Sequence, residues 1–222
     1  MSDRPISNQT SRFIQDRTHV LLVVDVQNDF CEGGALAVPD GDAVVPVINR
    51  LMGGFRLVVA SLDYHPANHA SFASAHVGRH PAETISLNGI SQVLWPDHCV
   101  ADTFGSELHP DLLNDPITKF VLKGTDSSVD SYSAFRDNAQ NHSTGLAAWL
   151  REEGVTHVVV TGLALDYCVK FTALDALAER FDTTVVTDAT RAVDLQCGDG
   201  DRAIEQLRAA GAHIATSDMI GR

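Results

Sequence analysis

Short apolar runs alternate along the chain with segments of helical spacing, and this alternation predicts the fold. Residues 19–25 (HVLLVVD) are apolar almost throughout until Asp25, which is typical of a strand buried on both faces of a parallel sheet. Five further runs predict strands, at 56–62, 118–122, 157–161, 184–187 and 213–216. The pattern therefore predicts a doubly wound α/β fold with a mostly parallel, six-stranded sheet.

Helices are predicted between these strands, on both faces of the sheet. Residues 42–52 carry their apolar side chains on one face and end at a pair of glycines, 53–54. Residues 144–153 are predicted to form a helix with Thr144 as its N-cap and a glycine after its end. Two more helices are predicted, one opening at Cys168 and one over 201–210.

Composition and charge narrow the class of protein. The chain has 222 residues, of which 44% are hydrophobic and 20% charged, so residues 1–222 are expected to form a single globular domain. The net charge of −13 argues against nucleic acid or an anionic membrane as the partner. No apolar run approaches the roughly 20 residues that a membrane span needs. A homo-oligomer is compatible with the sequence, which does not determine the number of subunits.

The cellular compartment is predicted from the N-terminal segment and the cysteines. The first 18 residues lack the apolar stretch of a signal peptide. Four cysteines in a chain of this length do not suggest a disulfide scaffold. We therefore predict a cytoplasmic protein with reduced thiols.

A reactive side chain stands at or just beyond the end of each of the first four predicted strands. These side chains are Asp25, Asp63, Lys123 and Cys168. The carboxyl ends of parallel strands meet at one edge of a sheet, where ligands bind in open α/β folds. An acid, a carboxylate ligand, a cation and a thiol at that edge predict an active site.

Cys168 is the candidate nucleophile. A cysteine at a helix start is expected to gain thiolate character, Lys123 would add to that effect, and Asp25 could accept the thiol proton. The alternative is a small buried hydrophobic residue, the usual role of a free cysteine. We assign that alternative to the three cysteines without such a position, Cys31, Cys99 and Cys197.

The long segment 64–115 carries most of the histidines and is predicted to be a functional, metal-binding insertion within the domain. Asp63 and His65, at i and i+2, project to the same side of an extended chain. Two imidazoles and a carboxylate are a common ligand set for a divalent metal. Spacing leaves the third ligand open among four histidines, His69, His76, His80 and His98, and solvated histidines are the alternative.

Five motifs in order along the chain resemble the metal-containing nicotinamidases of the isochorismatase-like cysteine hydrolase superfamily. They are VDVQNDFC at 24–31, DYHP at 63–66, WPDHC at 95–99, KG at 123–124 and GLALDYCV at 162–169. The resemblance extends from about residue 18 to residue 217. The second and third motifs are the more specific to the metal-containing members, and no catalytic position departs from the family pattern.

The resemblance implies a role for each matched position. Cys168 is implied as the nucleophile, with Asp25 and Lys123 completing a triad. The amides of Ala164 and Cys168 would form the oxyanion hole at a cis-peptide between Leu163 and Ala164. The implied metal ligands are Asp63, His65 and His98, with His69 as a candidate fourth ligand. The implied substrate-binding residues are Phe30, Trp95, Leu163, Tyr132 and Tyr167.

The resemblance also implies the reaction, which is hydrolysis of nicotinamide to nicotinate and ammonia through a cysteine thioester, a step of NAD salvage. The implied cofactor is one divalent metal, with zinc ahead of iron and manganese. Three alternatives remain. They are an amidase for carbamoyl or ureido substrates, a zinc hydrolase whose metal-bound water attacks directly, and a non-catalytic metal or redox sensor.

Overall fold

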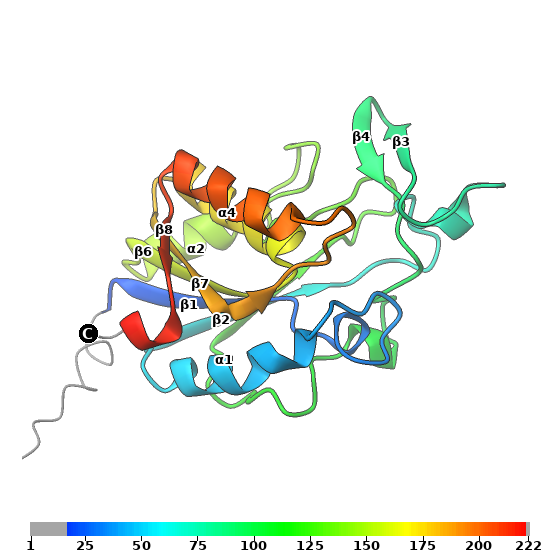
Figure 1. Ribbon diagram of the computed structural model, residues 1–222. Helices are drawn as coiled ribbons and strands as arrows, with labels where there is room; N and C mark the ends of the chain where they lie inside the picture. The colour runs from blue at the N-terminus through cyan, green and yellow to red at the C-terminus, as the bar shows by residue number, and fades with distance from the viewer. Residues whose placement is uncertain (1–16, 221–222) are drawn as a thin grey trace, which may run out of the picture.

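The computed structural model describes residues 17–220 and contains the predicted parallel sheet (Figure 1). Six strands are hydrogen-bonded in the order β5-β2-β1-β6-β7-β8, and every neighbouring pair is parallel. Their bounds are β1 His19–Val24, β2 Leu57–Asp63, β5 Lys119–Lys123, β6 His157–Leu163, β7 Asp182–Arg191 and β8 His213–Ala215. The predicted sheet is confirmed in strand number and direction.

Helices cover both faces of the sheet, as the alternating pattern predicts. Helix α1 (Val45–Met52) packs on one face, while α2 (Leu146–Glu152), α3 (Lys170–Ala178) and α4 (Asp199–Ala210) pack on the other (Figure 1). Strand β1 separates the two layers, because its side chains alternate between them. Val20 and Leu22 lie in the core under α2, α3 and α4, and Leu21 lies in the core under α1.

Several element boundaries differ from the prediction. The helix predicted from residue 42 begins with a 3₁₀ turn, Gly41–Val44, and becomes α-helical only at α1, where Pro46 can occupy the first turn without losing a hydrogen bond. The N-cap of α2 is Gly145, although the Thr144 hydroxyl does accept a hydrogen bond from the Leu146 amide at 3.2 Å. Strand β7 continues to Arg191, well beyond the short run predicted.

The segment 64–115 contains a small antiparallel hairpin that the apolar pattern did not predict. Strands β3 (Thr84–Leu87) and β4 (Ile90–Val93) pair with each other and not with the main sheet. Most of their side chains are exposed or half-buried, so they lack the apolar runs that mark the central strands. In Figure 1 the hairpin projects beside the carboxyl ends of the central strands.

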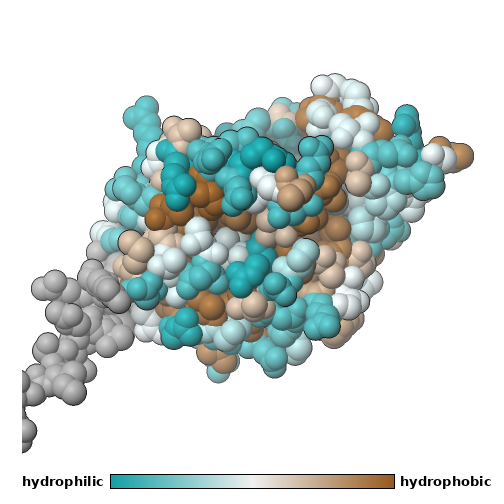
Figure 2. Space-filling view, viewed as in Figure 1, coloured by the Kyte–Doolittle hydropathy of each residue, from teal (hydrophilic) through white to brown (hydrophobic). Residues whose placement is uncertain are grey.

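The surface on the side of α4 is mostly hydrophilic, with smaller hydrophobic areas beside that helix (Figure 2). None of the helices in the described residues has the length and apolarity required to cross a lipid bilayer.

Candidate active site

The sheet brings three of the predicted residues to one edge. Asp63 and Lys123 are the last residues of β2 and β5, and the strand register places them directly opposite each other. Asp25 follows the last residue of β1 and has a φ of 47°, so the chain turns sharply there. All three side chains are buried, because loops close over the strand ends.

Lys123 is the centre of a buried charge network. Its Nζ lies 2.8 Å from Oδ2 of Asp25 and 2.5 Å from Oδ1 of Asp63. The same nitrogen donates to the carbonyl oxygen of Ser131 at 2.9 Å and lies 3.4 Å from Sγ of Cys168. Buried charges are costly unless they are paired, and here one cation serves two carboxylates.

The two carboxylates differ in their affinity for a proton. Burial raises the pKa of Asp25 by more than the neighbouring Lys123 ammonium lowers it. Burial also acts to raise the pKa of Asp63, but Lys123 and His65 outweigh it and hold that pKa well below the usual value. Asp25 is therefore the carboxylate suited to proton transfer, and Asp63 is the one suited to remain ionised as a metal ligand.

Cys168 lies in a π-helical turn, Leu165–Val169, that leads into α3, and its side chain reaches the same network. Burial raises the pKa of this thiol well above its usual value, and the charges of Asp25 and Asp63 add to the rise against the opposing effect of Lys123. Burial thus opposes the thiolate that the position of Cys168 at the helix start is expected to favour. A neutral thiol needs a base, and Asp25 is the neighbouring group that can accept its proton.

The Leu163–Ala164 peptide bond is cis, which is the geometry that the resemblance implies. It follows Gly162, whose φ is 105° and where an added Cβ would lie 2.0 Å from the Val24 carbonyl oxygen. Glycine is therefore required for β6 to pass β1 at this point. Ala164 lines the pocket beside Cys168.

A pocket with an empty volume of about 330 Å³ opens above Cys168. Four predicted ring-binding residues line it, Phe30, Trp95, Tyr132 and Tyr167. Leu163 does not line it, because its side chain is fully buried in the core under α1. Leu36, Asp130 and Val193 also line the pocket and are not among the predicted residues. Leu36 and Asp130 lie away from the strand ends, and Val193 lies two residues beyond β7, which extends past its predicted end at residue 187.

Asp63, His65 and His98 place one potential ligand atom each within 4.8 Å of one another. Oδ2 of Asp63 lies 3.5 Å from Nε2 of His65 and 3.6 Å from Nε2 of His98. Nδ1 of His65 donates to the Gly124 carbonyl oxygen at 2.9 Å, and Nδ1 of His98 donates to the Pro96 carbonyl oxygen at 2.8 Å. Because each Nδ1 carries the proton, each Nε2 has a free lone pair, and the set fits a divalent metal.

His69 lies close to this set, with its ring centroid 4.3 Å from that of His65. The Ser71 amide donates to its Nδ1 at 3.2 Å, which places the ring proton on Nε2, 3.3 Å from the Val129 carbonyl oxygen. Both nitrogens of His69 are thus engaged in this arrangement. His80 is exposed, and His76 is bonded to the carbonyl oxygen of Ala70.

Residues 19–219 match the family model described as the isochorismatase domain. The chain belongs to the isochorismatase family.

Relatives within the isochorismatase family resemble almost the whole chain. The nicotinamidase of Escherichia coli (strain K12) is 49% identical over 200 residues, which cover 88% of this chain and 93% of the relative. The solved nicotinamidase pyrazinamidase of Acinetobacter baumanii has a TM-score of 0.90 at 44% identity, covering 92% of this chain and 98% of that one. The pyrazinamidase of Pyrococcus horikoshii in complex with zinc has a TM-score of 0.73 at 35% identity, covering 90% and 99%.

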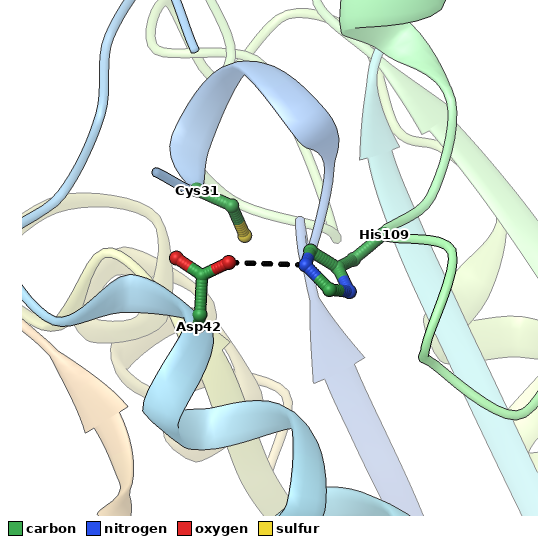
Figure 3. Close-up of side chains that lie close together, drawn as sticks. All are labelled: Cys31, Asp42 and His109. Carbon is green, nitrogen blue, oxygen red and sulfur yellow. Dashed lines mark hydrogen bonds and ion pairs between the residues drawn. The ribbon is translucent and has the colours of Figure 1, made fainter. Parts of the chain in front are cut away.

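This isochorismatase-family chain has a second group of metal-type side chains away from the pocket, Cys31, Asp42 and His109 (Figure 3). Nε2 of His109 donates to Oδ1 of Asp42 at 3.0 Å, and Nδ1 accepts from the Asp111 amide at 3.2 Å. Both ring nitrogens are therefore engaged. Burial, followed by the charge of Asp42, raises the pKa of the Cys31 thiol to about 12. The three side chains connect separate segments of the chain. Because the ring nitrogens are occupied and the thiol holds its proton tightly, the group is poorly suited to metal binding.

The four cysteines are free, and three of them are buried. Cys31 and Cys99 match the expected role of small buried residues. Cys197 does not, because it is exposed in the turn before α4. The prediction for Cys197 is wrong, since residues 194–197 are all exposed.

Proposed function

We propose that this protein hydrolyses the carboxamide C–N bond of nicotinamide and releases nicotinate and ammonia. It is an amidohydrolase of the isochorismatase family. The observation that carries the proposal is the junction at Lys123, whose Nζ lies 3.4 Å from the thiol of Cys168 and 2.5 Å from the carboxylate of Asp63. A nucleophile and a ligand set thus share one pocket.

The chain's own residues account for the steps at the carboxamide. Asp25 takes the proton of the Cys168 thiol as the sulfur forms a bond to the carboxamide carbon. The amides of Ala164 and Cys168 hold the developing oxyanion, and Lys123 holds Asp25 in place. Asp25 then passes the proton to the departing nitrogen, which leaves as ammonia. Water attacks the resulting thioester, nicotinate is released and the thiol is restored.

Asp63, His65 and His98 would hold one divalent metal, for which we propose zinc, with iron or manganese as the other candidates. When bound, the metal supplies a Lewis acid that coordinates the nitrogen of the pyridine ring and so orients the substrate. Phe30, Trp95, Tyr132 and Tyr167 would enclose the ring with flat apolar surfaces. Segment 64–115 acts as the metal-binding insertion, because it supplies both imidazoles.

The substrate is a small molecule, and we propose neither nucleic acid nor a membrane as a partner. The net charge of −13 supports this, because both of those partners are polyanionic surfaces. The four free cysteines support a reducing compartment such as the cytoplasm. The homo-oligomer stays a prediction.

The proposal is tested by measuring ammonia release from nicotinamide by the purified protein, with and without a chelator. We expect release that falls when the metal is removed and returns when it is restored. Release from carbamoyl or ureido amides but not from nicotinamide would favour the other amidases of the family. Activity surviving in Cys168→Ala would favour direct attack by metal-bound water, and no ammonia from any amide would favour a sensor.

A further inference from the structure

Gln92 is the buried residue of the β3–β4 hairpin, and it is polar. Every other side chain of the two strands is half-buried or exposed, while Gln92 is only 2% exposed. Burying an amide costs free energy unless it finds hydrogen-bond partners. The partners of Gln92 therefore indicate why a polar residue stands where the hairpin meets the domain.

The amide nitrogen of Gln92 points into the wall of the pocket. Its Nε2 lies 2.8 Å from Oδ2 of Asp130, 2.8 Å from the Val93 carbonyl oxygen and 3.1 Å from the hydroxyl oxygen of Tyr132. A carboxylate and a carbonyl oxygen can only accept, so the NH₂ end of the amide must face them. Asp130 and Tyr132 both line the pocket, whereas Gln92 does not.

The hydroxyl of Tyr132 joins Gln92 to the indole of Trp95. Nε1 of Trp95 donates to that hydroxyl at 3.2 Å. Nε2 of Gln92 has two hydrogens for three acceptors, so its longest contact, 3.1 Å to the Tyr132 hydroxyl, shares a hydrogen with one of the shorter contacts. The rings of Trp95 and Tyr132 meet edge to face with centroids 6.5 Å apart, and Trp95 meets Tyr167 in the same way at 4.8 Å. The Gln92 amide thus contacts the hydroxyl group through which Tyr132 and Trp95 are hydrogen-bonded in the aromatic wall of the pocket.

We propose that Gln92 is a positioning residue that holds Tyr132, and through it Trp95, in the orientation that binds the pyridine ring. This inference rests on the proposed nicotinamidase function. Gln92 touches no reacting atom, so its loss should weaken ring binding and leave the chemical step at Cys168 almost unchanged. The hairpin thereby acts as the outer support of the ring-binding wall.

The test is Gln92→Met, which keeps the length of the side chain and removes its donors. Loss of a hydrogen bond costs about 1 kcal/mol, which corresponds to about fivefold, so we expect KM for nicotinamide to rise about fivefold while kcat changes less than about twofold. The affinity for nicotinate, measured by calorimetry, should fall by a similar factor. Tyr132→Phe should raise KM comparably, and the double variant should be no worse than the poorer single variant, because both disrupt one network.

Asn88→Ala is the matched control, since Asn88 attaches the hairpin to the Ser128 carbonyl oxygen at 2.9 Å without reaching the pocket. Its KM should equal that of the wild type. If Gln92→Met fails to fold, Gln92→Asn gives the same test, because it keeps an amide too short to reach both partners. Unchanged KM and nicotinate affinity in a folded, active Gln92 variant would overturn the proposal, as would additive effects in the double variant. Absence of turnover in the wild type would instead count against the proposed function.

Discussion

Nζ of Lys123 lies 2.5 Å from Oδ1 of Asp63, so the lysine proposed for catalysis contacts a carboxylate proposed to bind metal. The same ammonium pairs with Asp25 at 2.8 Å. With both carboxylates ionised, this buried network would carry one more negative charge than positive charge. A divalent cation held by Asp63 would offset that excess, so metal binding and the triad are electrostatically coupled.

Replacing Lys123 tests this coupling. Lys123→Met removes the ammonium that pairs with two buried carboxylates, and we expect the variant to lose about 3–5 kcal/mol of unfolding free energy together with its activity. Denaturant unfolding monitored by circular dichroism measures the loss. Lys119→Met, on the same strand, is the control. Nζ of Lys119 lies 5.0 Å from the centroid of the Trp149 ring, so this replacement should lower the unfolding free energy by about 1 kcal/mol at most. Equal stability of the two variants would contradict the coupling.

The cysteines should differ in their reaction with iodoacetamide. Cys197 is exposed and should be labelled without loss of activity, so Cys197→Ser serves as the background. In that background, labelling of Cys168 should parallel inactivation and be slowed by nicotinamide. Burial raises the pKa of this thiol too, but Asp25 is beside it to accept its proton as the sulfur reacts. Since the pKa of Cys31 is raised to about 12, only about one molecule in 10⁴ carries its thiolate at pH 8, and labelling there should increase with pH. Mass mapping that finds Cys31 labelled in step with inactivation at pH 8 would reject the assignment of Cys168.

His98→Ala should lower the metal content and raise KM more than it lowers kcat, because the proposed metal holds the ring. Groups that merely orient a metal ligand typically contribute about tenfold or more to metal affinity, so loss of a ligand itself should lower the affinity at least about tenfold. Elemental analysis after dialysis against a fixed metal concentration measures the metal content. His80→Ala, an exposed histidine of the same segment, should retain full metal content. Full occupancy in His98→Ala would remove His98 from the site.

Gly124→Ala should weaken the metal site without changing any ligand. An added Cβ would lie 2.3 Å from Cε1 of His65, and Gly124 has a φ of 65°, which side-chain-bearing residues rarely adopt. We expect His65 to be displaced and the metal content to fall. Gly154→Ala, at a φ of 77° with no atom within 4 Å of the added Cβ, carries similar backbone strain and should keep its metal.

Three amides test how the ring is recognised. Benzamide has the shape of nicotinamide but no ring nitrogen, so it should lose the metal contact and keep the stacking. Water can take the vacant metal position, and we therefore expect kcat/KM to fall on the order of 10²-fold, less than for an unpaired buried group. Pyrazinamide keeps the nitrogen and should remain a substrate. Equal ammonia release from benzamide and nicotinamide would favour a general amidase.

The sheet and the residues at its edge could be predicted because the information is local. Five apolar residues before Asp25 identify a doubly buried strand, and its end places the acid at the ligand-binding edge. The same argument places Asp63 and Lys123, and the strand register puts them opposite each other. The carboxyl ends of parallel strands meet at one edge of the sheet regardless of the conformation of the connecting loops.

The conformation of the loops depends on contacts between residues far apart in the chain. The third metal ligand could have come from any of four histidines, and folding brings His98 to Asp63, 35 positions away, while Ser71 and Val129 engage His69. The thiol of Cys168 has a raised pKa because the assembled site buries it, which outweighs the helix start that its position suggested.

The parallel sheet, the reactive side chains at its edge and the family could therefore be inferred from the amino-acid sequence, because hydrophobic period and motif order are properties of the chain. Only the tertiary structure shows that Leu163 is buried in the core, that Asp130 lines the pocket and that Gln92 contacts the hydroxyl of Tyr132. Those outcomes depend on which polar groups find partners once the loops pack, and a buried amide is stable only where such partners meet it.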